Sequence, residues 1–210
     1  EIKPREMAFS VAIVFVMLAL GFLIGSKIGD HIAGENEKFT TAAQITDDEQ
    51  FQYALATDFG NVIAYGNLIA EQPVSADDLN GEYAILTKIT ERYTMHTREV
   101  TYTDSKGHTH TRTEIYWTWD RVKREEDSTE TFSFMGVSFP ADKFSVSTHR
   151  QGSMIYDNSE LRHYYVVADA SMVGSVHTRI KDHMIADGNE FYADTEPQAV
   201  VDRAVKNAGV

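Results

Sequence analysis

The sequence contains no cysteine. It therefore cannot form a disulfide framework, a thiolate metal site or a cysteine nucleophile. Basic residues are also scarce, with 19 Lys and Arg against 32 Asp and Glu and a formal charge of −13. In residues 1–34 three basic residues cancel three acidic ones, so the acidic excess lies on residues 35–210. Such a surface repels phosphate backbones and anionic headgroups, which argues against nucleic acid as a partner.

One long apolar run is present. Residues 7–26, MAFSVAIVFVMLALGFLIGS, contain no charged side chain and would cover about 30 Å as a helix, the hydrocarbon thickness of a bilayer. The alternative is a cleavable signal peptide, but the run is long for one and no A-x-A site follows it. We therefore predict an uncleaved transmembrane helix in contact with membrane lipid. Lys3 and Arg5 outnumber Lys27 as flanking cations, which favours a cytoplasmic N-terminus and an extracytoplasmic body.

Small residues recur along one stripe of this predicted helix. Gly21, Gly25 and Gly29 are spaced four apart in GFLIGSKIGD, and Ala8 and Ala12 add a second pair. Positions four apart share a helix face, and small residues there let a second backbone approach closely in lipid. The simpler explanation is that glycine is common in transmembrane helices. We predict packing against other transmembrane helices or copies of this chain.

The remaining chain divides into three parts. Residues 27–50 read as a juxtamembrane linker, residues 51–190 as a β-rich extramembrane domain and residues 191–210 as a C-terminal helix. Residues 46–59 begin that domain with a short helix, capped by Thr46 or Asp47. In the C-terminal helix Thr195 and Gln198 match a capping box, and Pro197 suits the first turn. The predicted fold class is α+β.

Strand patterns dominate from about residue 60 to 185. Segments rich in β-branched and aromatic residues alternate with turn-like pieces such as DSKG and PADK. No strand–helix alternation demands a parallel sheet, so we predict mainly antiparallel pairing.

The clearest pattern is a long hairpin over residues 91–122, turning at DSKG. Pairing Thr103 with His108 across a four-residue loop places Glu99 opposite Arg112, an attractive cross-strand pair. In this register Ile115 and Trp117 share a face and are expected to reach the core at the hairpin base. The Thr-rich tip is expected to project into solvent or onto a partner.

Histidines offer the only candidate metal ligands. His108 and His110 share one strand face, as two ligands would. The predicted register places Thr101 and Thr103 opposite them and His96 on the other face, so no third ligand is expected. No phosphate loop, nucleophile elbow or H-E-x-x-H motif occurs either. We expect no metal, no cofactor and no catalytic residue.

A family resemblance lies in the order of these segments. GNLIAEQPV carries Gly66, Leu68, Ala70, Pro73 and Val74 as G-x-L-x-A-x-x-P-V, followed by a long hairpin returning through YWTWDRV and a strand pair around FMGVSFPADKF. Over about residues 60–145 this resembles the membrane-anchored GIDE, or "beside a membrane", domain of mitochondrial ubiquitin ligases and bacterial membrane proteins. The resemblance implies a β-rich module held beside a bilayer. Without cysteine the chain cannot form the zinc-binding RING of the ligases, so their activity is not implied.

Two functions remain open. The first is a non-catalytic, membrane-anchored accessory or scaffold subunit that uses its β domain for protein–protein contacts. The second is a membrane-tethered ligand-binding or sensor module, with its ligand at the hairpin tip or between sheet and C-terminal helix. For the first we predict a partner interface that includes Tyr102, His108, His110 and Trp119, since aromatic residues are enriched at interfaces.

Overall fold

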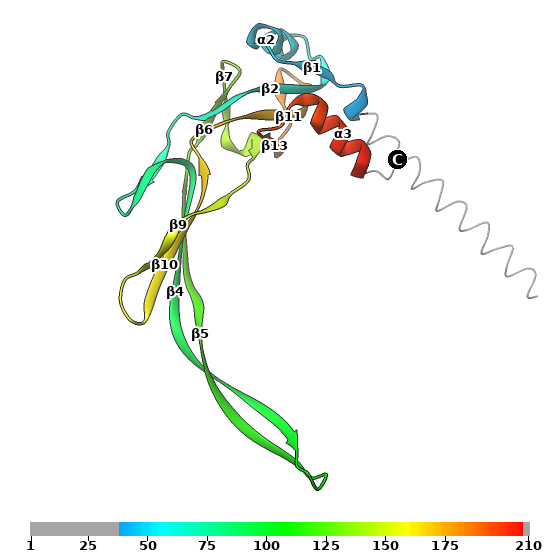
Figure 1. The fold of residues 1–210 in the computed structure, drawn as a ribbon. Helices are drawn as coiled ribbons and strands as arrows, with labels where there is room; N and C mark the ends of the chain where they lie inside the picture. The colour runs from blue at the N-terminus through cyan, green and yellow to red at the C-terminus, as the bar shows by residue number, and fades with distance from the viewer. Residues whose placement is uncertain (1–37, 208–210) are drawn as a thin grey trace, which may run out of the picture. The chain divides into compact units, whose positions relative to one another are not determined.

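The computed structural model describes residues 38–207 (Figure 1). The predicted transmembrane helix at residues 7–26 and its stripe of Gly21, Gly25, Gly29, Ala8 and Ala12 lie outside the described residues. Within residues 38–207 no helix is long and apolar enough to cross a membrane. The two α helices described there have 9 and 11 residues, against the roughly 20 that a bilayer requires. On this finding the prediction of a single-pass membrane protein with an extracytoplasmic domain is corrected to a chain without a membrane-spanning helix in residues 38–207.

The predicted fold class is also wrong. The described residues are mostly β rather than α+β, with thirteen strands, the short helices α2 and α3, and one 3-10 helix. Both predicted helices form, but they are short, and two of the strands run for 25 and 20 residues. The described part of the chain divides into two compact units: residues 38–65, 175–186 and 195–207 form the first, and residues 66–174 and 187–194 the second.

The first unit contains both helices. Its elements are β1 (Ala43–Ile45), α2 (Asp48–Ala56), the start of β2 (Gly60–Ala70), the end of β11 (Ser171–Lys181), β12 (Met184–Ile185) and α3 (Pro197–Asn207). β1 pairs in parallel with β2, and β12 pairs antiparallel with β11. β1 and the first turn of α2 therefore fall within residues 27–50, where a linker was expected.

Local signals explain where the two helices begin. Asp47 caps α2, because its Oδ1 accepts hydrogen bonds from the backbone N–H groups of Glu49 and Gln50 at 3.0 and 3.1 Å. Phe51, Ala54 and Leu55 are buried along one side of α2, whereas Phe59 beyond the helix is exposed. Pro197 is the first residue of α3, where its missing N–H costs nothing.

The second unit contains two sheets. In the first, the order is β7 (Val137–Pro140), β6 (Thr131–Phe134), β2, β11, β13 (Asn189–Ala193) and β8 (Phe144–Ser145), with a 3-10 turn, η1, at Ala141–Lys143. Pairing is parallel between β13 and β8 and antiparallel between β2, β6 and β7. Its core is aromatic, built from buried Phe132, Phe134, Phe139, Phe144 and Phe191.

The second sheet holds the long hairpin. Its strands are β3 (Val74–Ala76), β4 (Leu79–Thr103), β5 (Thr109–Ser128), β9 (His149–Tyr156) and β10 (Leu161–Asp169). β10 pairs with β4 only as far as Arg92, opposite Leu161. Beyond that point β4 and β5 continue as a two-stranded ribbon (Figure 1). The small apolar core beneath the sheet consists of Tyr83, Leu86, Tyr165 and Val167.

Candidate protein-interaction surface on the hairpin

The hairpin turn sets the register of β4 and β5 from the tip to the pair of Glu91 and Arg121, beyond which the register shifts. The Asp104 backbone N–H donates to the His108 carbonyl at 2.9 Å, and the Gly107 N–H donates to the Asp104 carbonyl at 3.0 Å. The loop between the closing pair is therefore Ser105–Lys106–Gly107, with Gly107 at φ 85°. A three-residue loop that ends in a left-handed glycine is a standard hairpin connection.

The predicted register is therefore wrong by one residue. Thr103 pairs with Thr109 rather than with His108, because the loop closes one residue later than expected. Glu99 lies opposite Thr113 instead of Arg112, and the cross-strand ion pair joins Arg98 to Glu114 at 3.0 Å. A one-residue slip moves every side chain of one strand to the opposite face relative to the other strand.

In the observed register the odd-numbered side chains of β4 and β5 lie on one face. There Tyr93 stacks on Trp117 with ring centroids 5.1 Å apart, and it lies 5.1 Å from Trp119. Tyr156 from β9 meets Trp119 edge-on at 5.9 Å. With Met95 and Ile115, which flank Trp117, these residues form what we call the aromatic strip: Tyr93, Met95, Ile115, Trp117, Trp119 and Tyr156.

Most of the aromatic strip is exposed. Met95 and Trp117 are 51% and 52% exposed, and Ile115 and Tyr156 are 63% and 62% exposed. The expectation that Trp117 and Ile115 reach the core is therefore wrong, since both lie on the ribbon beyond the last residue that β10 pairs. Large apolar side chains gathered on one exposed face mark interaction surfaces more often than isolated ones do.

A charged clamp holds the strip where it joins the sheet. The Arg162 guanidinium lies 4.2 Å from the ring centroid of Trp119 and forms a 2.7 Å ion pair with Glu91. Cation–π contact and ion pairing fix the plane of the Trp119 ring, so this end of the strip is ordered. Trp119, half-buried as a result, is the only predicted interface residue that belongs to the strip.

The other predicted interface residues lie at the tip and on the even-numbered face. Tyr102 and His110 are cross-strand partners whose rings stack at 5.5 Å. His108 and His110 each place a ring nitrogen 3.3 Å from Asp104 Oδ2. The His108 backbone N–H, followed by these contacts, holds the pKa of the Asp104 carboxyl below its usual range. Tyr102, His108 and His110 therefore do not join Trp119 in one patch.

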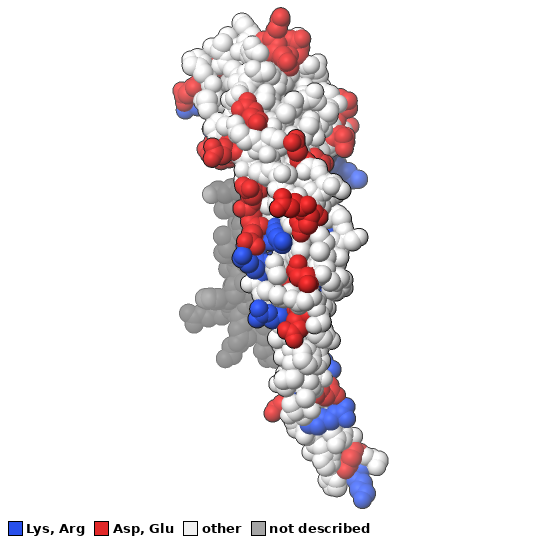
Figure 2. Space-filling view, turned by 90° about the vertical axis from the view of Figure 1, so that its left-hand side faces the viewer, with Lys and Arg blue, Asp and Glu red and all other residues white. Residues whose placement is uncertain are grey.

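The even-numbered face is polar. His96, predicted on the other face from His110, shares this one, and its Nε2 lies 2.5 Å from Asp120. Hydrogen bonds from the Thr118 hydroxyl and from His96 lower the pKa of the Asp120 carboxyl. Figure 2 shows basic and acidic side chains interspersed along the part of the molecule where the hairpin lies in Figure 1. Within the described residues no cluster of three or more His, Cys, Asp or Glu could hold a metal ion.

A second polar cluster lies where the hairpin meets β10. His163 is only 2% exposed, and its two ring nitrogens lie 2.7 Å from Asp78 and 2.9 Å from Asp157. The Tyr165 hydroxyl donates to Asp78 at 2.5 Å, which lowers the pKa of that carboxyl. Burial, followed by the hydrogen bond to Asp78, raises the pKa of Tyr165. Both ring nitrogens of His163 are thus engaged by carboxylates of the chain itself.

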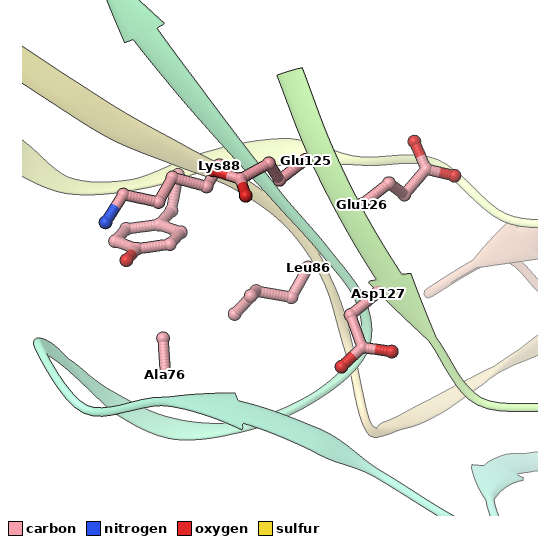
Figure 3. A pocket seen from close by; sticks show the side chains of 7 residues that line it. Ala76, Leu86, Lys88, Glu125, Glu126 and Asp127 are labelled. Atoms are coloured by element: carbon pink, nitrogen blue, oxygen red, sulfur yellow. The ribbon is translucent and has the colours of Figure 1, made fainter. Parts of the chain in front are cut away.

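An open cavity of about 320 Å³ lies beside this cluster (Figure 3). Tyr165, Ala76 and Leu86 supply its apolar wall, and Lys88, Glu125, Glu126 and Asp127 supply charged groups. In Figure 3 Ala76 and Leu86 point into the same space from different strands, while Glu126 points away from it. Lys88 Nζ lies 3.8 Å from Asp78, so the lysine already has a carboxylate of the chain as its ion-pair partner.

Sequence reasoning missed Tyr93, Met95 and Tyr156. The sequence does show that Tyr93 and Met95 share a face of their strand, because side chains of odd and even positions alternate between the two faces. Only the register decides whether Tyr93 shares a face with Trp117, and the predicted register put them on opposite faces. The clamp of Arg162 and Glu91 depends on pairing between β4 and β10, 71 residues apart, and no local pattern reveals it.

Comparison of the chain with protein-family models, with curated proteins and with solved structures gave no match. The resemblance to the GIDE domain therefore stays a prediction.

Proposed function

We propose that this chain is a non-catalytic protein-interaction module whose aromatic strip docks on the surface of a partner protein. The observation that supports this is the strip itself: two tryptophans, a tyrosine, a methionine and an isoleucine on one face of the ribbon, and Tyr156 of β9 beside them. Trp, Tyr and Met are enriched at protein interfaces, and Trp and Tyr at the positions that supply most binding energy.

The surroundings of the strip favour a protein partner over a nucleic acid or a free small molecule. The net charge of −13 opposes phosphate-rich ligands. The strip lies on an open ribbon, whereas sites for small molecules are usually concave and bury most of their ligand. Tyr93 and Trp117 stack face to face, so each ring also covers part of the other rather than offering both faces to a ligand. A partner with exposed apolar side chains fits this surface.

The test uses a photo-crosslinking amino acid placed at position 117 of the full chain in its native cells. We expect one protein to be crosslinked from position 117 and not from position 116, which lies on the opposite face and is also exposed. That protein, once purified, should bind Trp117→Ala at least about tenfold more weakly than the wild type, as expected for a central interface tryptophan.

The matched control is Tyr53→Ala, which removes an even more exposed aromatic ring, from α2, and should leave the affinity unchanged. The proposal fails if positions 116 and 117 give the same crosslinked products, or if neither gives any. It also fails if the purified partner binds Trp117→Ala as tightly as the wild type.

A further inference from the structure

The outer edge of β5 is a second feature of the hairpin, distinct from either face. β4 pairs with one edge of β5 from Thr109 to Ser128, and no strand in residues 38–207 pairs with the other. Near the body this edge is heavily charged, from Asp120 to Asp127, which discourages strand addition. From Thr109 to Trp119 it is rich in β-branched and aromatic residues with two charges only, which suits an added strand.

The hairpin turn shows which backbone groups point outward along this edge. Asp104 and His108 are a hydrogen-bonded pair. Hydrogen-bonded and non-hydrogen-bonded pairs alternate along an antiparallel ladder, so the backbone groups of the even-numbered residues of β5 bond to β4. On the other side of β4 the Tyr93 N–H donates to Glu160, which confirms that odd-numbered residues there point away from β5. The outward N–H and C=O groups of β5 therefore belong to odd-numbered residues, including Thr111, Thr113 and Ile115.

Two charges on this edge are complementary to each other under a two-fold axis. Arg112 and Glu114 lie two residues apart on the same face, with Arg112 Nη2 2.6 Å from Glu114. If two copies of β5 pair antiparallel around Thr113, Arg112 of each copy faces Glu114 of the other. The four charges then alternate in sign around a square. Both Arg–Glu pairs occupy non-hydrogen-bonded positions, where opposed side chains are closest.

Other arrangements lack this match. Centring the pairing on Arg112 or on Glu114 places two like charges opposite each other, which is destabilising. The outer edge of β4 cannot substitute, because its Arg98 and Glu99 are adjacent in sequence and so lie on opposite faces.

We propose that the partner of this edge is a second copy of the chain, joined by antiparallel pairing of the two β5 strands about Thr113. A two-fold axis perpendicular to the sheet keeps the faces in common. The two aromatic strips then lie on the same face of one four-stranded ribbon. The inference goes beyond the proposed function, because it concerns the strand edge and not the strip.

Because the chain has no cysteine, single-cysteine variants of the full chain test the register directly. At the two-fold centre the Cα atoms of Thr113→Cys in the two copies should lie about 5.5 Å apart, within disulfide range. Thr111→Cys alone should not crosslink, since its copies are about 13 Å apart, but mixed with Ile115→Cys it should. A disulfide yield that is equal at all three positions, or absent from Thr113→Cys, overturns the proposal.

Charge variants test the complementarity without cysteine chemistry. Arg112→Glu should weaken dimerisation at least about tenfold in sedimentation equilibrium, because each cross-strand pair then places two glutamates opposite each other. Adding Glu114→Arg to it should restore the dimer, since the square is then rebuilt with its signs exchanged. If the double variant is no better than the single one, or the wild type stays monomeric, the inference is wrong. Trp117→Ala, which tests the strip, leaves this charge square intact, so the two proposals can fail separately.

Discussion

At the scale of single residues, the tightest steric constraint is at Gly174 in β11. A Cβ atom there would lie 2.2 Å from the Tyr192 carbonyl oxygen and 2.9 Å from the Ala193 Cα. Both obstacles are main-chain atoms of β13, which cannot swing aside as a flexible side chain would. We therefore expect Gly174→Ala to lower the free energy of unfolding by about 3 kcal/mol or more, as overpacking does, measured by urea denaturation.

Gly107→Ala is the comparison for this prediction. Gly107 has φ 85°, but nothing lies within 4 Å of an added Cβ, so only backbone strain is introduced. That strain should cost about 1 kcal/mol. If Gly174→Ala proves no more costly than Gly107→Ala, the close approach of β11 and β13 is not what requires glycine at position 174.

At the scale of elements, the first helix shows how local signals specify a structure. The Asp47 side chain satisfies two backbone N–H groups that α2 would otherwise leave unpaired. Asp47→Ala should lower the free energy of unfolding by about 1 kcal/mol, the usual value of such a cap, and reduce amide protection in the first turn of α2. Gln52→Ala, on the exposed side of the same helix, should change neither quantity measurably. Equal effects of the two variants would contradict the capping role.

The hairpin shows where local signals run out. Strand alternation and the DSKG turn predicted its existence and the position of its tip. The register depended on whether Asp104 closes the loop or belongs to it, and the predicted Glu99–Arg112 pair favoured the wrong choice. The Asp104 carboxylate, which accepts hydrogen bonds from the backbone N–H groups of Lys106 and His108, supports closure of the loop at the pair of Asp104 and His108. One hydrogen-bonding side chain thus decides which side chains share a face from the tip to the pair of Glu91 and Arg121, beyond which the register shifts by one residue.

The candidate surface was predictable only in part for the same reason. Trp119 was singled out from its residue type, but Tyr93 and Met95 join it only in the observed register. Tyr156 and Arg162 come from β9 and β10, about 40 residues beyond Trp119 in the chain, and β10 lies between β4 and β9 in the sheet. Contacts of this kind arise from tertiary packing, which overrides any single-strand pattern.

At the scale of the whole molecule, the His163 cluster links three separate segments of the second unit. Asp78 precedes β4, Asp157 follows β9, and His163 and Tyr165 lie on β10 between them. The pKa of Asp78 is lowered in the folded state, so its contribution to stability is present above the unfolded pKa of about 3.9 and is lost as the pH falls. The pKa of Tyr165 is raised, so its contribution is present below about pH 10 and is lost as the pH rises.

Replacing Tyr165 with phenylalanine tests this linkage, because it removes the hydroxyl and keeps the buried ring. We expect Tyr165→Phe to lower the free energy of unfolding by about 1 kcal/mol at pH 7, a value discounted for the partial exposure of Asp78. The difference from the wild type should shrink in urea titrations as the pH falls below 4, because protonated Asp78 no longer gains from the hydroxyl. The matched control is Tyr164→Phe, whose ring packs under Arg150 on the opposite face and should show no such pH dependence. A difference for Tyr165→Phe that stays constant from pH 7 to pH 3 would mean that Asp78 gains nothing from this hydrogen bond.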